Sequence, residues 1–350
     1  MISFGRDNSI VLEIKDDFVD ILVGNSRNIL FSDSIPIPEG LCDGGLILDV
    51  SRLSEILLKY FLENDINEKK LSFVAFGSDI VVRCIEIPSM NDEALREAME
   101  FEIKEIIPNE EEYYIDYEVV SKNKENKKNV KLNVIVVACM KKKIDSYVEL
   151  SKSLGKKIDV IDVLTNTINK VLLKSNLQYK NKAVAIFYLG YTFSNISISY
   201  DGVMNIERSI PFGFQNIIRE FERSKLEENS QYMENRSREK LLRDLNLEGT
   251  NIEILFKQYP RLKESIDKLF SIVEKTIKFY NTTKGNEKVS NMYIISNLSV
   301  SRTASNYIEN YFDTNSILLK DVKELGLKVR NKNKNFGKFL PLYGLFLRRS

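Results

Sequence analysis

The sequence predicts an α/β protein built from two related domains that flank a cleft. The chain has 350 residues, more than one hydrophobic core usually organises, and 43% of them are apolar. A β-hairpin pattern over residues 9–24 is followed by a helical pattern, and the same order returns from residue 183 onward. Because each half opens with a hairpin and continues into helices, we interpret the chain as a duplication of one α/β unit.

The first half begins with the segment SIVLEIKDDFVDILVG, in which two β-rich runs surround the polar residues Lys15 to Asp17. Residues 51–64 are predicted to be a helix, because Leu53, Ile56, Leu57, Tyr60 and Phe61 recur on one helical face. The segment LSFVAFG, residues 71–77, is typical of a buried strand. These elements form the first part of one domain.

A smaller α/β unit follows this first part. Asn91 can cap a helix that runs to residue 107, since its side chain can accept from the free amides of the first turn. Two β-runs, over residues 113–120 and 130–140, flank a lysine-rich loop, and residues 144–155 are predicted to be helical. Residues 159–173 are predicted to be one further, longer helix.

The second half repeats the opening pattern. The predicted elements are β-runs over residues 183–200 and 203–210, a helix over 214–222, a charged helical section from about Lys225 to Leu247, a helix over 266–281, a strand over 291–298 and a helix over 301–312. We interpret the charged section as a solvated helix on the outside of the second domain.

Composition excludes several classes of function. The net charge of +1 gives no electrostatic case for nucleic acid or an anionic membrane surface, and the basic run Lys141 to Lys143 is interpreted as solvated. The three cysteines lack metal-site or disulfide spacing, which favours a reducing cytoplasm. The absence of histidine excludes a histidine-based triad and histidine-bound metals. No signal peptide or membrane span is apparent in the sequence, so direct membrane insertion is not expected.

A specific set of motifs begins near Val82. In the segment RCIEIPSMNDEALREAMEFEIKEIIPNEEEYYIDYEVV, the spaced elements are Pro88 and Met90, Phe101 and Glu102, Ile107 and Pro108, and Asp116 and Tyr117. The later segments YDGVMNIERSIPFGF, IVEKTIKFY and YGLFLRR follow in the same order. On these motifs the chain resembles PilM, the actin-like family of type IV pilus assembly.

The resemblance implies an actin-like fold, a duplicated ribonuclease-H-like pair of domains, with a small subdomain inserted in the first domain as in FtsA. It further implies a cytoplasmic scaffold at the inner face of the membrane, which binds the cytoplasmic N-terminal tail of a PilN-like membrane protein and links the membrane components to pilus motor ATPases. The expected ranges are residues 1–80, 155–178 and 330–350 for the first domain core, 81–154 for the inserted subdomain, 179–215 and 275–329 for the second domain core, and 216–274 for a helical outer subdomain.

Many members of the family bind ATP and Mg, and the corresponding cleft residues here are Glu13, Lys15, Gly190, Thr192, Gly213 and Ser296. The first hairpin lacks the family's glycine and carries acids in its turn, and Tyr188 stands where a metal-linked aspartate is expected. Losing two charged hydrogen bonds, each worth roughly 1.5–3 kcal/mol, would move a micromolar dissociation constant to millimolar or beyond. We therefore predict a vestigial nucleotide cleft, no cofactor and no enzymatic activity.

The same resemblance suggests a peptide groove beside the inserted subdomain, with Phe101, Glu102, Ile107 and Pro108 as candidate partner-binding residues. An apolar anchor with a carboxylate for a basic residue is the expected chemistry. Three alternatives stay open. The first is an active actin-like ATPase or FtsA-like filament, and the second is a type II secretion platform component, for which a later transmembrane helix would be expected. In the third, the acids of EIKDDFVD hold a metal instead of being solvated.

Overall fold

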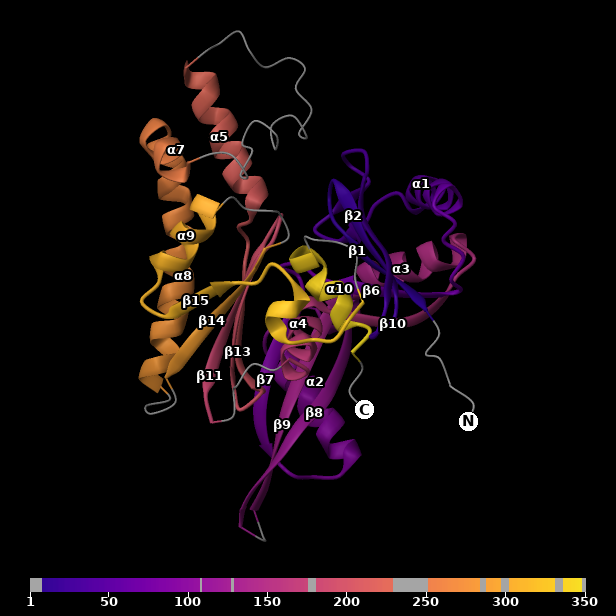
Figure 1. The fold of residues 1–350 in the computed structure, drawn as a ribbon. Coiled ribbons are helices and arrows are strands. Elements are labelled where there is room, and N and C mark those ends of the chain that lie inside the picture. The colour runs from indigo at the N-terminus through magenta and orange to yellow at the C-terminus, as the bar shows by residue number, and fades with distance from the viewer. Residues whose placement is uncertain are drawn as a thin grey trace.

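The computed structural model describes residues 8–107, 109–126, 129–175, 181–228, 251–283, 288–296, 302–330 and 336–347. Within these residues two five-stranded sheets form the two halves of the molecule, and a three-stranded sheet lies below them in the view of Figure 1. The two large sheets have the same topology. Each contains three antiparallel strands in sequence, followed by two strands that join the other edge in parallel.

The first sheet has the order β10-β6-β1-β2-β3. Its strands are β1 (Ser9–Ile14), β2 (Phe18–Gly24), β3 (Ile29–Pro36), β6 (Lys70–Ala75) and β10 (Lys157–Val163). Helices α1 (Val50–Glu63) and α3 (Lys141–Ser153) cover one face, and α4 (Leu164–Leu173) and α10 (Leu340–Gly344) cover the other. The side chain of Asp49 accepts from the amide of Arg52 and caps α1, which buries Leu53, Leu57 and Phe61 as the sequence pattern predicts.

The second sheet has the order β13-β12-β11-β14-β15. Its strands are β11 (Ala183–Leu189), β12 (Ser194–Tyr200), β13 (Val203–Ile210), β14 (Val289–Ser296) and β15 (Asn315–Leu318). Its outer face is covered by α5 (Phe214–Glu228), α7 (Ile252–Gln258), α8 (Pro260–Thr283) and α9 (Arg302–Tyr311). Its inner face packs on α4 and α10, so these two helices lie between the sheets and share one core with both of them (Figure 1).

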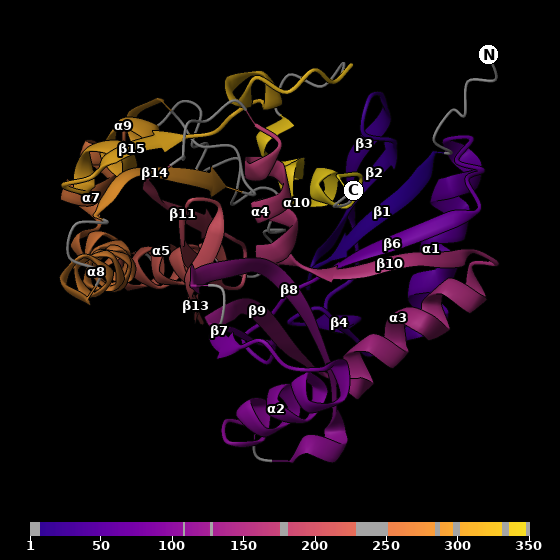
Figure 2. The ribbon, with the colours of Figure 1, turned by 90° about the horizontal axis from the view of Figure 1, so that it is seen from below.

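The small sheet has the order β7-β9-β8, with strands β7 (Val81–Pro88), β8 (Tyr113–Asn126) and β9 (Asn129–Met140). Its helix α2 (Asp92–Lys104) packs on the face that carries Val134, Val136 and Ala138. The other face of β9, with Ile135 and Cys139, turns toward the first large sheet, because successive strand residues point to opposite sides. Figure 2 shows the small sheet between α2 and the strands β10 and β6.

The remaining short elements connect these sheets. A two-stranded ribbon, β4 (Cys42–Asp43) and β5 (Leu46–Ile47), lies beside α3, and short 3-10 turns occur at Glu110–Glu112, Val322–Leu325 and Phe336–Phe339.

One helix expected from the sequence differs from the structure, and two further expectations can be compared with it only in part. Residues 159–173 are not one helix, because residues up to Val163 pair with β6 as strand β10 and only the rest forms α4. Tyr147, Leu150 and Leu154 join the core of the first sheet, so α3 packs there although the predicted inserted subdomain extends to residue 154. In the charged section, helix α5 continues to Glu228, and residues 229–247 lie outside the described residues.

Candidate functional site

The hairpins β1–β2 and β11–β12 occupy equivalent places in the two large sheets. Ile14 pairs with Val19 and Leu189 pairs with Ser194, so each hairpin closes with four residues between its last paired positions. This register makes Lys15 equivalent to Gly190 and Glu13 equivalent to Tyr188. It agrees with the alignment made from the sequence.

Lys15 lies inside an ionic cluster in the first hairpin. Its ammonium donates to Asp20 and lies 3.2 Å from a carboxylate oxygen of Glu13, and the three side chains are at most 2% exposed. Burial opposes the charge on Lys15, but the carboxylates of Asp20 and Glu13 outweigh it and raise the pKa of the lysine. Burial raises the pKa of Glu13, and the nearby carboxylate of Asp20 adds to this rise against the opposing effect of Lys15. The sequence left the direction of Lys15 open, and the fold turns it back onto its own hairpin.

Tyr188 joins the two hairpins across the space between the domains. Its hydroxyl donates to Glu13 over 3.2 Å, and the tyrosine is 1% exposed. Asp20 also accepts from the hydroxyl of Ser34, which in turn accepts from Lys338 over 2.8 Å. The cluster therefore receives donors from both domains and from the C-terminal part of the chain.

Aromatic rings fill the space around the second hairpin. Phe18 contacts Tyr191 edge to face with centroids 5.3 Å apart, and Phe76 stacks on Phe193 at 5.4 Å with nearly parallel rings. In each pair one ring belongs to the first domain and the other to the loop after β11. These contacts close the domains on each other at the hairpins.

The two glycines of the second hairpin region are explained by close backbone packing. A Cβ on Gly190 would lie 2.3 Å from the carbonyl oxygen of Phe193, and one on Gly213 would lie 2.4 Å from that of Tyr191. The first amides of α5 donate back to this loop, Phe214 to the carbonyl of Gly190 and Gln215 to that of Tyr191. Both glycines are thus required by the loop's own packing.

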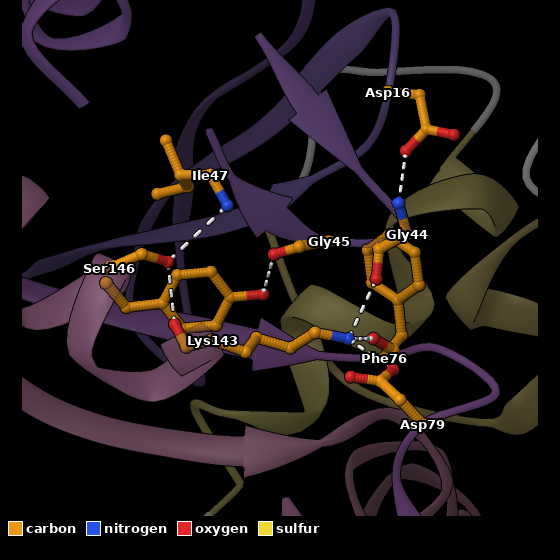
Figure 3. Close-up of polar contacts among 9 residues, drawn as sticks. Asp16, Gly44, Gly45, Ile47, Phe76, Asp79, Lys143 and Ser146 are labelled. Atoms are coloured by element: carbon orange, nitrogen blue, oxygen red, sulfur yellow. Dashed lines mark hydrogen bonds and ion pairs between the residues drawn. The ribbon is translucent and has the colours of Figure 1, made fainter. Parts of the chain in front are cut away.

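The other predicted cleft residues lie near these hairpins. Thr192 is half-buried in the second hairpin loop, and Ser296 ends β14, where it pairs with Leu189 and is 7% exposed. Asp16 in the first turn accepts from the amide of Gly44 at 2.7 Å, as Figure 3 shows. Within the described residues, no three carboxylates or cysteines gather as a candidate metal site.

A cavity of about 250 Å³ opens between the small sheet and the first domain. We call it the β8–β10 groove, and it is lined by residues from the end of β6, from β8, β9 and β10, and from α3 and α4. The lining consists of Ala75, Tyr114, Asp116, Tyr117, Glu118, Ile135, Val137, Cys139, Ile144, Ile161, Asp162, Val163 and Asn166. An apolar majority combined with three carboxylates fits a chain segment that carries apolar and basic side chains.

The polar groups of the groove are held by neighbours. Asp162 accepts from Lys170 at 2.6 Å and from the amide of Asn166 at 3.0 Å. The hydroxyl of Tyr114 donates to Asp145 over 3.0 Å, and this bond raises the pKa of the tyrosine. Among the described residues, the side-chain oxygen of Asn166 is buried with no hydrogen-bond partner, so the groove wall contains a spare acceptor.

The predicted partner-binding residues do not line this groove. Phe101 is 62% exposed and Glu102 is also exposed, on the face of α2 that points away from the small sheet. Ile107 is buried in the small core, and Pro108 lies outside the described residues. The reason is helical geometry, because Leu95, Met99 and Ile103 anchor α2 to the sheet and turn Phe101 to the opposite side.

Sequence reasoning missed the residues that do line the groove. Asp116 belonged to the motif that carried the resemblance but was not proposed as a contact. The alternation along β8 places Tyr114, Asp116 and Glu118 on one face and the apolar Ile115 and Val119 on the other. This alternation is the feature of the sequence that could have predicted the groove residues.

The duplicated sheets, with two helices between them and a small sheet inserted in the first half, define an actin-like fold. A model of the family described as "Type IV pilus assembly protein PilM" matches residues 25–349. The chain therefore belongs to this family, and the predictions of fold class and family from the sequence are confirmed. The matched range begins after the first hairpin, so Glu13 and Lys15 lie outside it.

Solved structures agree on the fold. The "PilM-PilN type IV pilus biogenesis complex" matches with a TM-score of 0.80 and 16% identity, covering 98% of each chain. The ethanolamine utilization protein EutJ from Carboxydothermus hydrogenoformans matches at 0.53 with 9% identity, covering 99% of this chain and 91% of EutJ. MreB5 of Spiroplasma citri bound to ADP matches at 0.50 with 9% identity, covering 97% and 95%. No curated protein sequence matches.

Proposed function

We propose that this chain is a scaffold of the type IV pilus assembly platform that binds the cytoplasmic N-terminal tail of a PilN-like inner-membrane protein in the β8–β10 groove. Its membership of the PilM family supports a role in type IV pilus assembly. Its likeness in fold to the protein solved as a PilM-PilN complex supports the kind of partner. The groove itself is the observation that carries the proposal.

The groove offers two ways to hold an extended peptide. Strands β8 and β10 are edge strands of their sheets, so each has a row of main-chain groups that an added strand can pair with. Side chains supply selectivity, because Ile135, Val137 and Ile161 accept an apolar anchor while Asp116 and Glu118 attract a basic residue. Anchors of this kind carry most of the energy in peptide recognition.

A binding assay distinguishes the groove from the helix face that the sequence favoured. A fluorescent peptide of the PilN-like tail is titrated with the wild type and with Asp116→Lys, Glu118→Lys, Phe101→Ala and Glu102→Lys, four variants at partly or fully exposed positions. We expect each charge reversal in the groove, Asp116→Lys or Glu118→Lys, to weaken peptide binding about tenfold or more, because a charged contact is worth roughly 1.5–3 kcal/mol. The two α2 variants are expected to bind like the wild type. Loss of binding in the α2 variants alone would move the peptide site to α2.

We also propose that the space between the hairpins binds no nucleotide and that the chain has no ATPase activity. The residues present do not suit Mg and ATP. Lys15 is already neutralised by Glu13 and Asp20, and Tyr188 occupies the position of the metal-linked carboxylate. A buried carboxylate about 5 Å from a phosphate would cost roughly 3 kcal/mol at an effective dielectric of about 20.

Calorimetry tests the nucleotide proposal. We expect no saturable heat when MgATP is titrated to millimolar concentration into the folded protein. Saturable micromolar binding would instead favour the alternative of an active actin-like ATPase.

We further propose that the protein is cytoplasmic and reaches the inner face of the membrane through its partner. Within the described residues, every helix is too short or too polar to cross a bilayer. Deleting the cytoplasmic tail of the PilN-like protein should move the chain from the membrane fraction to the soluble fraction. Unchanged membrane association after that deletion would contradict the proposal.

A further inference from the structure

We propose that Lys143 fixes the hinge of the inserted small sheet and thereby sets the width of the β8–β10 groove, which makes it a positioning residue for peptide binding. The inference rests on the proposed function for the identity of the peptide, but its structural part does not. It also corrects the interpretation of the run Lys141 to Lys143 as solvated, because Lys143 is only 2% exposed.

The ammonium of Lys143 is fully engaged by one acceptor from each of three neighbours. It donates to the carbonyl of Gly44 at 2.8 Å, to the carbonyl of Phe76 at 2.7 Å and to the carboxylate of Asp79 at 2.6 Å (Figure 3). An ammonium has three N–H donors, so each has a partner. A buried cation satisfied in this way resists displacement, because any movement leaves a charged group without its bonds.

Phe76, Asp79 and Lys143 itself lie where the chain enters and leaves the small sheet. Residues Phe76 to Asp79 connect β6 of the first domain to β7 of the small sheet. Lys143 stands in the first turn of α3, directly after β9 returns from the small sheet. The two connections are therefore bonded to each other through one side chain, and this bond restrains rotation of the small sheet relative to the first domain.

The backbone at this point is shaped to receive the lysine. Gly77 has a φ of +134°, and a Cβ there would lie 2.7 Å from the Lys143 nitrogen and 2.4 Å from Asp79. A second hydrogen bond joins α3 to the β4–β5 ribbon. Tyr147, one turn after Lys143 in α3, donates its hydroxyl to the carbonyl of Gly45 at 2.7 Å. The ribbon β4–β5 is thus held to α3 at both of its turn glycines.

The hinge lies directly beside the groove. Ala75 and Ile144, which both line the groove, are the chain neighbours of Phe76 and Lys143. Asp145, next along α3, holds the groove residue Tyr114. Because the groove walls belong to the small sheet on one side and to the first domain on the other, an unpinned hinge lets them separate.

The hinge is also tied to the first hairpin. Gly44, whose carbonyl accepts from Lys143, donates its amide to Asp16 at 2.7 Å. The turn beside the Lys15 cluster is therefore two hydrogen bonds away from the groove hinge. This gives Asp16 a role other than metal or phosphate binding.

The experiment compares Lys143→Met with Lys142→Met, which changes the exposed neighbour in the same run. Spin labels at Lys59→Cys on α1 and Glu102→Cys on α2, both exposed, report the orientation of the small sheet by electron–electron distance measurement without peptide. We expect Lys143→Met to broaden the distance distribution and Lys142→Met to leave it unchanged. An unchanged distribution in folded Lys143→Met would overturn the proposal.

Peptide kinetics supply the second readout. With the fluorescent tail peptide as probe, Lys143→Met should lower affinity about tenfold or more, mainly through faster dissociation. Asp79→Asn removes the charge from one of the three contacts and is the milder variant if Lys143→Met does not fold. It should give a smaller change of the same sign, and wild-type kinetics in Asp79→Asn with an unchanged distance distribution would also count against the hinge. If the peptide does not bind the wild type, the proposed function fails, while the distance measurement still decides the hinge.

Discussion

The hairpins β1–β2 and β11–β12 have the same register and the same place in their sheets, yet different interactions stabilise their turns. The first is stabilised by the buried ions Glu13, Lys15 and Asp20, and the second by aromatic rings and two closely packed glycines. They meet at the hydrogen bond from Tyr188 to Glu13. The comparison teaches that the same hairpin register can be stabilised by buried ions in one domain and by ring and backbone packing in the other.

The largest expected effect is in the ionic hairpin. Lys15→Ala leaves two buried carboxylates without their cation, and we expect it to lower the free energy of unfolding by about 3–5 kcal/mol. Urea denaturation measures the change. Lys142→Ala, at an exposed position, should stay within about 0.5 kcal/mol of the wild type. An equally mild Lys15→Ala would mean that the ions do not stabilise the hairpin.

The packing of the β11–β12 hairpin is tested by Gly213→Ala, a change at a residue that contacts the loop of this hairpin. The new methyl group would lie 2.4 Å from the carbonyl oxygen of Tyr191, so the loop has to move. We expect a loss of about 1–3 kcal/mol in the same denaturation experiment. Gly155→Ala serves as a control for steric contact, since nothing lies within 4 Å of its Cβ position, although its φ of +62° carries its own strain of about 1 kcal/mol.

The link between the hairpins is tested by Tyr188→Phe. This change removes the hydroxyl that donates to Glu13 and keeps the ring that contacts Phe193. We expect a loss of about 1 kcal/mol, the net value of one hydrogen bond, seen as a lower melting temperature. An unchanged melting temperature would show that packing alone holds the two hairpins together.

The smallest expected effect concerns pH. Asn195 is the second-hairpin equivalent of Asp20, and its amide donates to Glu207 of β13. Burial raises the pKa of Glu207 to about 7, against the opposing effects of Asn195 and Arg83. Because the folded state then binds the proton more tightly than the unfolded state, stability falls as pH rises from about 4.5 to about 7.

Glu207→Gln should remove this part of the pH dependence. We expect the variant to match the wild type near pH 4.5 and to exceed it by about 1 kcal/mol at pH 8, since solvent screening reduces the full effect. Denaturation curves at the two pH values give the difference. If the variant has the same free energy of unfolding as the wild type at both pH values, Glu207 is not the source of this pH dependence.

The sequence by itself determined the duplicated α/β plan, the family and the departures in the hairpins, because hydrophobic periodicity and short motifs are local properties of the chain. It determined that the first hairpin has a lysine where its counterpart has Gly190. It also determined which face of helix α1 is buried, as Leu53, Leu57 and Phe61 illustrate.

Only the tertiary structure decided what those residues face. Periodicity places Asp116 and Phe101 on particular faces, but which face meets another domain depends on contacts between segments far apart in the chain. The same holds for charge. Lys143 looks like a solvated lysine in the sequence, and it is buried only because carbonyls and a carboxylate far along the chain satisfy it. Lys15 was expected in the nucleotide cleft, but the fold pairs it with carboxylates of its own hairpin. The β8–β10 groove and the contacts of Lys143 belong to this second kind of information.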